Sequence, residues 1–217
     1  MNMARRLKHL AAGEATLYGF WRILPWFLER SSARIRARSL GWHNGHVPSG
    51  SRVRGTRFIT VGVNFFASGR VLLEAIAEYE GRVYSPRISI GNNVRTSEGL
   101  HVTAINSVRI GDDCLFGSGV FVGDHSHGGY RGNEQSTPDE APARRELISH
   151  GAVEIGTRCW IGDNAVILGP VCIGDGVVVA ANSVINRDVP AESIVAGAPG
   201  RVVRRYDRQT RTWKGLG

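Results

Sequence analysis

The chain has 217 residues, a length that predicts one domain with short appendages at its ends. Its formal net charge of +8 is concentrated at the termini: residues 1–60 hold eleven Arg or Lys against two Glu, and residues 201–217 hold six against one Asp. Basic ends around an acidic middle exclude a continuous nucleic-acid groove, and no nucleic-acid-binding motif is present, so local anion or membrane-surface sites are favoured.

Residues 1–45 form a separate basic and aromatic region. The apolar stretch at 15–28 contains Arg22 and Pro25, and it is too short and too interrupted to span a bilayer. We expect helical structure here. Two roles remain open: a cap on the open end of the repeat structure that follows, or interfacial contact of residues 15–38 with the inner face of a membrane. The protein is otherwise expected to be cytoplasmic.

An aliphatic or aromatic residue recurs every six positions in the next part of the chain. The spaced residues are Val53, Ile59, Phe65, Val71, Ala77 and Val83. The register slips near Pro86 and again between Thr96 and Val102. From Val108 it is regular again, until it breaks at Asp124.

The same period is clearest between residues 155 and 189. The aliphatic positions are Ile155, Ile161, Ile167, Ile173, Val179 and Ile185, and four residues after each comes a second inward candidate: Cys159, Ala165, Val171, Val177, Ser183 and Val189. A period of six matches neither an α-helix nor a single strand and indicates a solenoid. We therefore predict a parallel β-helix in which each six residues form one strand and one turn.

The three cysteines fit this prediction. Cys114 and Cys159 occupy inward positions, Cys172 lies next to one, and no CxxC pair occurs. We interpret them as small core residues in a reducing compartment, and we expect no structural zinc.

The repeat is interrupted by residues 126–151, a polar segment without periodicity. Long loops in compact folds are often functional. This one begins at Asp124, His125, Ser126 and His127, the densest cluster of titratable groups in the chain. We therefore place the candidate active site where the loop leaves the solenoid.

The repeats, the DHSHGGY loop start, the VEIGTRCWIGDNAVILGPVCIGDG run and the SIVAGAPGRVVRRY ending together resemble the hexapeptide-repeat O-acetyltransferases. The capsule, O-antigen and exopolysaccharide sugar acetyltransferases are the most similar group. The resemblance covers residues 50–206. It implies a left-handed parallel β-helix over residues 46–200, acetyl-CoA as acyl donor without a metal, and a homotrimer with active sites between subunits. For the basic residues 201–217 we expect a short closing helix.

The resemblance also implies roles for individual residues. His125 matches the catalytic base, with His127 as second candidate. For Asp124, the adjacent carboxylate, two roles remain open: it orients the imidazole, or it is a solvated turn residue. Trp160 and His101 are expected to contact the acceptor. Tyr130 is also expected to contact it, because it lies in the long loop just after the candidate base and can stack on a sugar. Six residues are expected to contact the cofactor: Asp163, Ala181, Asn186, Arg187, Arg201 and Arg204.

These residue types suit acyl transfer. A sugar hydroxyl is a poor nucleophile at neutral pH, and a neutral imidazole can accept its proton as it attacks a thioester. Arginine guanidinium groups near the C-terminus suit the phosphates of coenzyme A. No motif indicates a covalent acyl-enzyme, so direct transfer is expected.

We therefore expect an acetyl-CoA-dependent O-acetyltransferase that acts on a sugar hydroxyl of a bacterial surface glycan or its precursor. Three alternatives remain open. One is N-acetylation of a nucleotide-linked amino sugar with the same base and cofactor. Another is a γ-class carbonic anhydrase-like zinc enzyme, although that family pairs His residues five apart and His125 and His127 are two apart. The third is a non-enzymatic scaffold.

Overall fold

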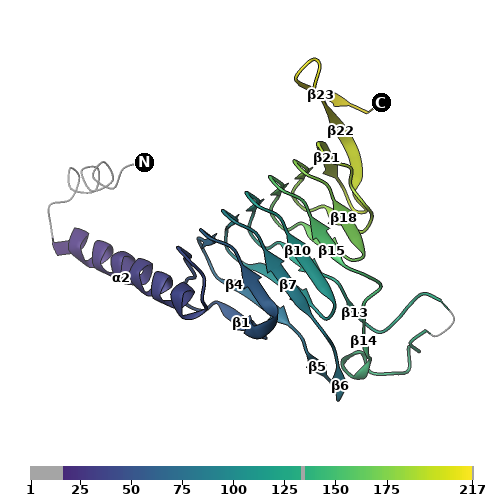
Figure 1. The fold of residues 1–217 in the computed structure, drawn as a ribbon, viewed down its shortest axis with the longest axis horizontal. Helices are drawn as coiled ribbons and strands as arrows, with labels where there is room; N and C mark the ends of the chain where they lie inside the picture. The colour runs from purple at the N-terminus through teal and green to yellow at the C-terminus, as the bar shows by residue number, and fades with distance from the viewer. Residues whose placement is uncertain (1–16, 133–134, 217) are drawn as a thin grey trace.

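The protein folds as a parallel β-helix, as the six-residue period predicts, and it is the left-handed form that the family resemblance implies (Figure 1). The computed structural model describes residues 17–132 and 135–216, with the backbone alone for residues 17–27. Successive strands of the coils join three sheets in turn and pair in parallel, so each sheet forms one face of a three-sided solenoid. Each face takes its name from the number of strands in its sheet.

The six-stranded face contains β1 (Arg52–Arg54), β4 (Val71–Ala75), β9 (Leu100–Ala104), β12 (Phe121–Gly123), β17 (Val166–Leu168) and β20 (Val184–Ile185). The five-stranded face contains β2 (Ile59–Val61), β7 (Arg87–Ile90), β10 (Ser107–Ile110), β15 (Val153–Ile155) and β18 (Val171–Ile173). The eight-stranded face contains β3 (Phe66–Ala67), β8 (Arg95–Thr96), β11 (Leu115–Phe116), β16 (Trp160–Ile161), β19 (Val178–Val179), β21 (Ser193–Ala196), β22 (Arg201–Asp207) and β23 (Thr212–Gly215).

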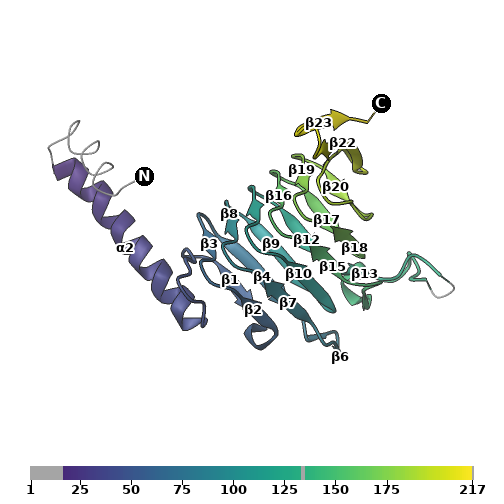
Figure 2. The same ribbon diagram turned by 45° about the horizontal axis from the view of Figure 1, so that its top comes forward.

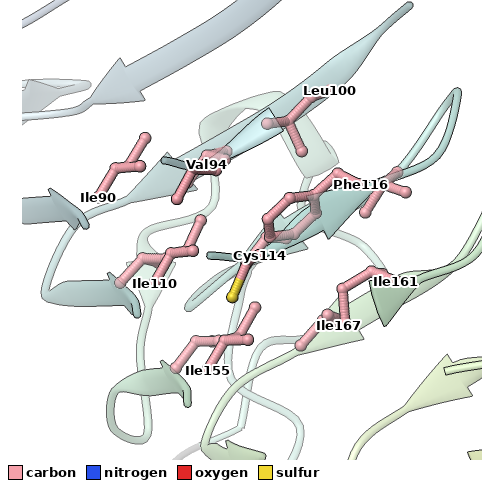
Figure 3. Close-up of a cluster of buried hydrophobic side chains, with 14 of the residues drawn as sticks. Ile90, Val94, Leu100, Ile110, Cys114, Phe116, Ile155, Ile161 and Ile167 are labelled. Atoms are coloured by element: carbon pink, nitrogen blue, oxygen red, sulfur yellow. The ribbon is translucent and has the colours of Figure 1, made fainter. Parts of the chain in front are cut away.

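The core is a narrow column of side chains inside the solenoid (Figure 3). All twelve inward positions predicted between residues 155 and 189 are at most 4% exposed. Cys114 and Cys159 are buried, as predicted, but the interpretation of Cys172 as a core residue is wrong: it is exposed, because it lies next to an inward position and points outward. The six-residue period thus reports which side chains enter this column, because every coil contributes equivalent positions to it.

Backbone hydrogen bonds join each coil to the next. Along one corner the N–H groups of Gly91, Gly111 and Gly156 donate to Ile110, Ile155 and Ile173, each at 2.8 Å. Turn carboxylates add to this ladder: Asp112 accepts from the Asn92 N–H at 2.7 Å, and Asp175 accepts from the Thr157 N–H at 2.7 Å. The coils are therefore held at the spacing of neighbouring strands.

Helix α2 (Leu17–Ser39) lies at the N-terminal end of the solenoid (Figure 2). Ala33 and Ala37 are fully buried, and Arg36 Nε donates to the Val47 carbonyl at 2.9 Å. Glu29 accepts hydrogen bonds from Arg36 at 2.7 Å and from the Ser49 N–H at 2.8 Å, and the latter bond lowers the pKa of the Glu29 carboxyl. These contacts attach the C-terminal part of α2 to the segment that leads into the first coil, and the capping role stays a prediction.

The rest of the N-terminal prediction is not addressed by these contacts. Residues 1–16 lie outside the described part of the chain. Among the residues that the structure describes, no helix is long and apolar enough to cross a membrane. Interfacial contact of residues 15–38 stays a prediction.

One part of the predicted repeat is wrong. Ala77 and Val83 continue the six-residue spacing, but they belong to an excursion from the solenoid, the antiparallel hairpin β5 (Glu78–Tyr79) and β6 (Arg82–Val83). Val83 is 82% exposed. The chain rejoins the five-stranded face at β7, which accounts for the slip of register near Pro86. A short 3₁₀ turn, η1 (Thr56–Phe58), precedes β2.

The predicted C-terminal helix is also wrong. Residues 201–215 contain β22, which runs antiparallel to β21, and β23, which runs antiparallel to β22. Two adjacent valines favour a strand here, and Tyr206 faces Trp213 across the pair with ring centroids 5.3 Å apart. The last coil leaves the backbone N–H and C=O groups along the edge of β21 unpaired. As a strand, β22 pairs with these groups, whereas a helix would leave them without partners.

The burial pattern predicts different effects for two residues that both follow the six-residue spacing. Replacing Ile161 with Ala should lower the free energy of unfolding by about 2–5 kcal/mol, because it leaves a cavity in the core. Replacing Val83 with Ala should change it by less than about 0.5 kcal/mol. Urea unfolding at matched protein concentration measures both, and a large effect of the Val83 variant would contradict the assignment of this hairpin to the surface.

Candidate functional site

The candidate site begins where β12 ends at a corner of the solenoid. Asp124 is 1% exposed, and its two carboxylate oxygens accept hydrogen bonds from the backbone N–H groups of Ile105, at 3.0 Å, and Asn106, at 2.8 Å. Ile105 and Asn106 form the tight corner of the preceding coil. Asp124 therefore ties two successive corners together from inside the protein.

His125 is fixed by the same carboxylate. Its Nδ1 lies 2.8 Å from Asp124 Oδ1, and the side chains of His125 and Asp124 are 8% and 0% exposed. A carboxylate that already receives two N–H donors can only accept here, so we assign the proton to Nδ1. This leaves Nε2 as the basic nitrogen. An imidazole held in this way is suited to remove a proton from a bound hydroxyl.

His127 has a different environment. It lies on β13 (Ser126–His127), which pairs antiparallel with β14 (Leu147–Ile148) at the base of the long loop. The residue is exposed, and its ring contacts the edge of Tyr79, with centroids 5.3 Å apart. His127 contacts Tyr79, whereas His125 contacts Asp124. The contact with a carboxylate makes His125 the stronger candidate for the base.

Tyr130 is held by the loop itself. Its hydroxyl donates to the His127 carbonyl at 2.6 Å and accepts from Arg145 Nη1 at 2.8 Å. Arg145 also donates to the carbonyls of Thr137 and Glu140, just before the 3₁₀ turn η2 (Pro142–Arg144). The Tyr130 hydroxyl is thus occupied, while the side chain remains 53% exposed and available for stacking.

His101 lies on β9, next to β12 on the six-stranded face. It is paired in register with Phe121, and the two rings meet edge to face at 5.0 Å. His101 Nε2 lies 3.2 Å from a carboxylate oxygen of Glu74. His125 lies past the end of β12, at the corner that ends this face, so His101 is on the adjoining face and contacts Glu74.

Trp160 lies on a different face. It belongs to the eight-stranded face, in register with Leu115 and Val178, and it is 54% exposed. His125 lies at the corner between the six-stranded and five-stranded faces. A single chain therefore does not bring Trp160 and His125 together.

Two of the candidate cofactor residues follow the same corner as His125. Leu168 is in register with Gly123, and Ile167 with Ile185, so Asn186 and Arg187 lie at this corner two coils further on. Neighbouring strands are about 4.8 Å apart, which places these two residues about 10 Å along the edge from the end of β12. Both are exposed.

Asp163 and Ala181 lie at the corner between the eight-stranded and six-stranded faces. Asp163 Oδ1 accepts from the Ser118 N–H at 2.6 Å, the same turn bond that Asp112 and Asp175 make. This bond gives Asp163 a structural role, and a carboxylate also repels phosphate. Its contact with the cofactor stays a prediction, as does that of the exposed Ala181.

Arg201 and Arg204 lie on β22, on a strand instead of the predicted helix. Both are exposed; Arg201 Nη1 donates to the Gly200 carbonyl at 3.0 Å and Arg204 Nη1 to the Trp213 carbonyl at 3.3 Å. Each guanidinium group has further N–H donors for a phosphate. Among residues 17–132 and 135–216, no group of three or more His, Cys, Asp or Glu side chains is placed to hold a metal ion.

Sequence reasoning missed two parts of the site. The bonds from Asp124 to the Ile105 and Asn106 N–H groups could not be predicted, because they depend on how successive corners stack. The β5–β6 hairpin could have been predicted from the sequence. Glu80 and Gly81 lie between two short β-prone segments, and a two-residue turn ending in Gly is typical of a hairpin.

Two family models match the chain. The "Bacterial transferase hexapeptide (six repeats)" model matches residues 152–187, and the "Hexapeptide repeat of succinyl-transferase" model matches residues 107–123. Both matches fall on coils of the solenoid on either side of the long loop.

Two relatives from Escherichia coli strain K12 cover most of the chain. A putative lipopolysaccharide biosynthesis O-acetyl transferase, WbbJ, is 32% identical over 162 residues, which are 75% of this chain and 79% of the relative. Galactoside O-acetyltransferase is 29% identical over 184 residues, covering 80% of this chain and 79% of the relative.

A solved structure shares the fold. A mutant of AntD, an N-acyltransferase from Bacillus cereus in complex with dTDP and coenzyme A, superposes with a TM-score of 0.57 at 18% identity, covering 78% of this chain and 84% of that one. Together with the repeats, the identity to the first relative over three quarters of the chain establishes the family. The chain belongs to the bacterial hexapeptide-repeat acyltransferases.

Proposed function

We propose that the protein transfers an acetyl group from acetyl-CoA to a hydroxyl group of a sugar in a bacterial surface glycan or its precursor. The observation that carries this proposal is the buried Asp124–His125 pair at the corner where the long loop begins. The O-acetyl transferases among its relatives support the acyl group and the hydroxyl acceptor.

The pair suits direct transfer. The sugar hydroxyl adds to the thioester carbonyl while His125 Nε2 takes its proton, and the tetrahedral intermediate then releases coenzyme A as a thiolate that receives this proton. Asp124 holds the imidazole in the required tautomer and stabilises it while it is protonated. General-base assistance of this kind contributes roughly 10²–10⁴-fold to the rate.

The exposed guanidinium groups of Arg187, Arg201 and Arg204 support a phosphate-binding role on the C-terminal coils. The loop, including Tyr130, begins directly after His125 and can contact the acceptor without contacting those coils. Donor and acceptor are therefore proposed to approach the base from opposite ends of the corner.

Replacing His125 with Ala should lower kcat by roughly 10²–10⁴-fold with little change in acetyl-CoA binding, because the base acts in the transition state. Replacing His127 with Ala should have a smaller effect. The measurement is release of coenzyme A thiol with a panel of pyranoside, nucleotide-sugar and amino-sugar acceptors. An inactive His127 variant beside an active His125 variant would reverse the assignment, and transfer to amines alone would replace O-acetylation with N-acetylation.

Replacing Asp124 with Asn should lower both activity and stability. An amide offers one acceptor oxygen where the carboxylate offers two, so a buried N–H loses its partner at a cost of about 1–3 kcal/mol. Asp175→Asn is the matched control, because that carboxylate also accepts a backbone N–H but lies in an exposed turn. Thermal unfolding and kcat should both separate the two variants; equal effects would show that Asp124 is only a turn residue.

We also propose a homotrimer whose sites combine His125 of one subunit with Trp160 of its neighbour. The exposed Trp160 and Leu115 on the eight-stranded face support this arrangement, since Trp160 lies on a different face from His125 within one chain. Sedimentation equilibrium should give three times the chain mass of 23.6 kDa. Mixed assemblies of His125→Ala and Trp160→Ala subunits should regain activity; a fully active monomer would contradict the proposal.

A further inference from the structure

Both excursions from the solenoid leave from the same corner. The β5–β6 hairpin connects β4 to β7, and the long loop connects β12 to β15, so both run from the six-stranded to the five-stranded face. One tight corner, Ile105 and Asn106, lies between them, and it is the corner that Asp124 binds. Figure 1 shows β5, β6, β13 and β14 projecting on the same side of the solenoid.

The hairpin has a tightly defined backbone. Its strands pair as Glu78 with Val83 and Tyr79 with Arg82. The two turn residues, Glu80 and Gly81, have φ angles of 46° and 76°. Positive φ at both central residues is the requirement of a type I′ turn, which matches the twist of the flanking strands. The side chain of Tyr79 is therefore presented in a fixed direction.

Tyr79 contacts the long loop at two separate points. Its hydroxyl donates to the Ala143 carbonyl at 2.6 Å, and its ring meets the His127 ring edge to face, with centroids 5.3 Å apart and planes at 73°. His127 lies two residues after the candidate base, and Ala143 lies in the far part of the loop. Tyr79 thus joins the two halves of the loop to one rigid hairpin.

Other contacts hold the same pair of segments together. The Tyr84 hydroxyl accepts from the Leu147 N–H at 3.2 Å, and Arg82 forms an ion pair with Glu146. Both partners lie at or next to β14, the returning stem of the loop. Tyr79 is distinguished from these two residues because it alone among them contacts His127, on the outgoing stem beside His125.

We infer that Tyr79 is a specificity-determining residue for the sugar acceptor: it positions His127 and the 137–145 part of the loop as the wall against which the acceptor binds. This inference rests on the proposed function. Amphipathic rings such as Tyr79, His127 and Tyr130 suit a pyranose, which presents both an apolar face and hydroxyl groups. The hairpin lies on the N-terminal side of the base, whereas the candidate phosphate-binding residues lie on the C-terminal coils, so the effect should be confined to the acceptor.

The test compares Tyr79→Phe, which removes the hydrogen bond to Ala143, and Tyr79→Ala, which also removes the ring contact. Val83→Ala in the same hairpin is the control, because Val83 is 82% exposed. Kinetics use acetyl-CoA with the best sugar of the acceptor panel, and with water alone as acceptor. Hydrogen exchange is followed over residues 126–148.

Tyr79→Phe should raise the KM for the sugar by roughly tenfold, which corresponds to the free energy of about one hydrogen bond. Tyr79→Ala should raise this KM further. Exchange over the loop should be faster in both variants. The KM for acetyl-CoA and the rate of acetyl-CoA hydrolysis should stay within about twofold of the wild type, as should every value for Val83→Ala.

Faster exchange without a change in the sugar KM would overturn the inference, because Tyr79 would then only stabilise the loop. Parallel losses in sugar transfer and acetyl-CoA hydrolysis would overturn it as well, since they would show general damage to the site. If the wild type transfers acetyl groups to no sugar or amino sugar, the proposed function fails and the inference falls with it. That outcome is recognised before any variant is measured.

Discussion

The whole structure depends on hydrogen bonding between the backbones of successive coils. Each short strand is too small to be stable alone, and its N–H and C=O groups are satisfied only by the coil before and the coil after it. Because this pairing fixes the distance between coils, side chains at equivalent positions stack directly on one another. A single column of aliphatic residues can then form the core.

This regularity determines where function can be placed. A residue inside a strand cannot move without displacing its neighbours in two other coils, so additional chain is accommodated only at corners. Both insertions occur at one corner of the solenoid, and the short corner between them is bound by Asp124. The candidate base is therefore held through Asp124 by a corner that keeps the repeat, while the segments around it come from the two parts that depart from it.

The same regularity explains how far the sequence could be interpreted. A six-residue period predicted the fold and the inward face from Ile155 to Val189, because burial repeats with the coil. It failed at Val83, where the spacing continues by coincidence through a hairpin. It also gave no information on β22, since pairing with an open edge depends on the preceding coil and not on local composition. The adjacency of Asp124 and His125 was visible in the sequence, but the contact of Tyr79 with a residue 48 positions away has no periodic signal.

The two ends of the solenoid differ, and this difference affects how copies of the protein can associate. At the first coil, α2 packs through Ala33 and Ala37, while among the described strands β1 and β2 keep an unpaired edge on that side. At the last coil, the chain turns back and pairs antiparallel with its own edge. A parallel solenoid grows by adding a strand in the same direction, and a reversed strand interrupts that geometry. At the C-terminal end, the reversed strand therefore disfavours end-to-end stacking along the eight-stranded face.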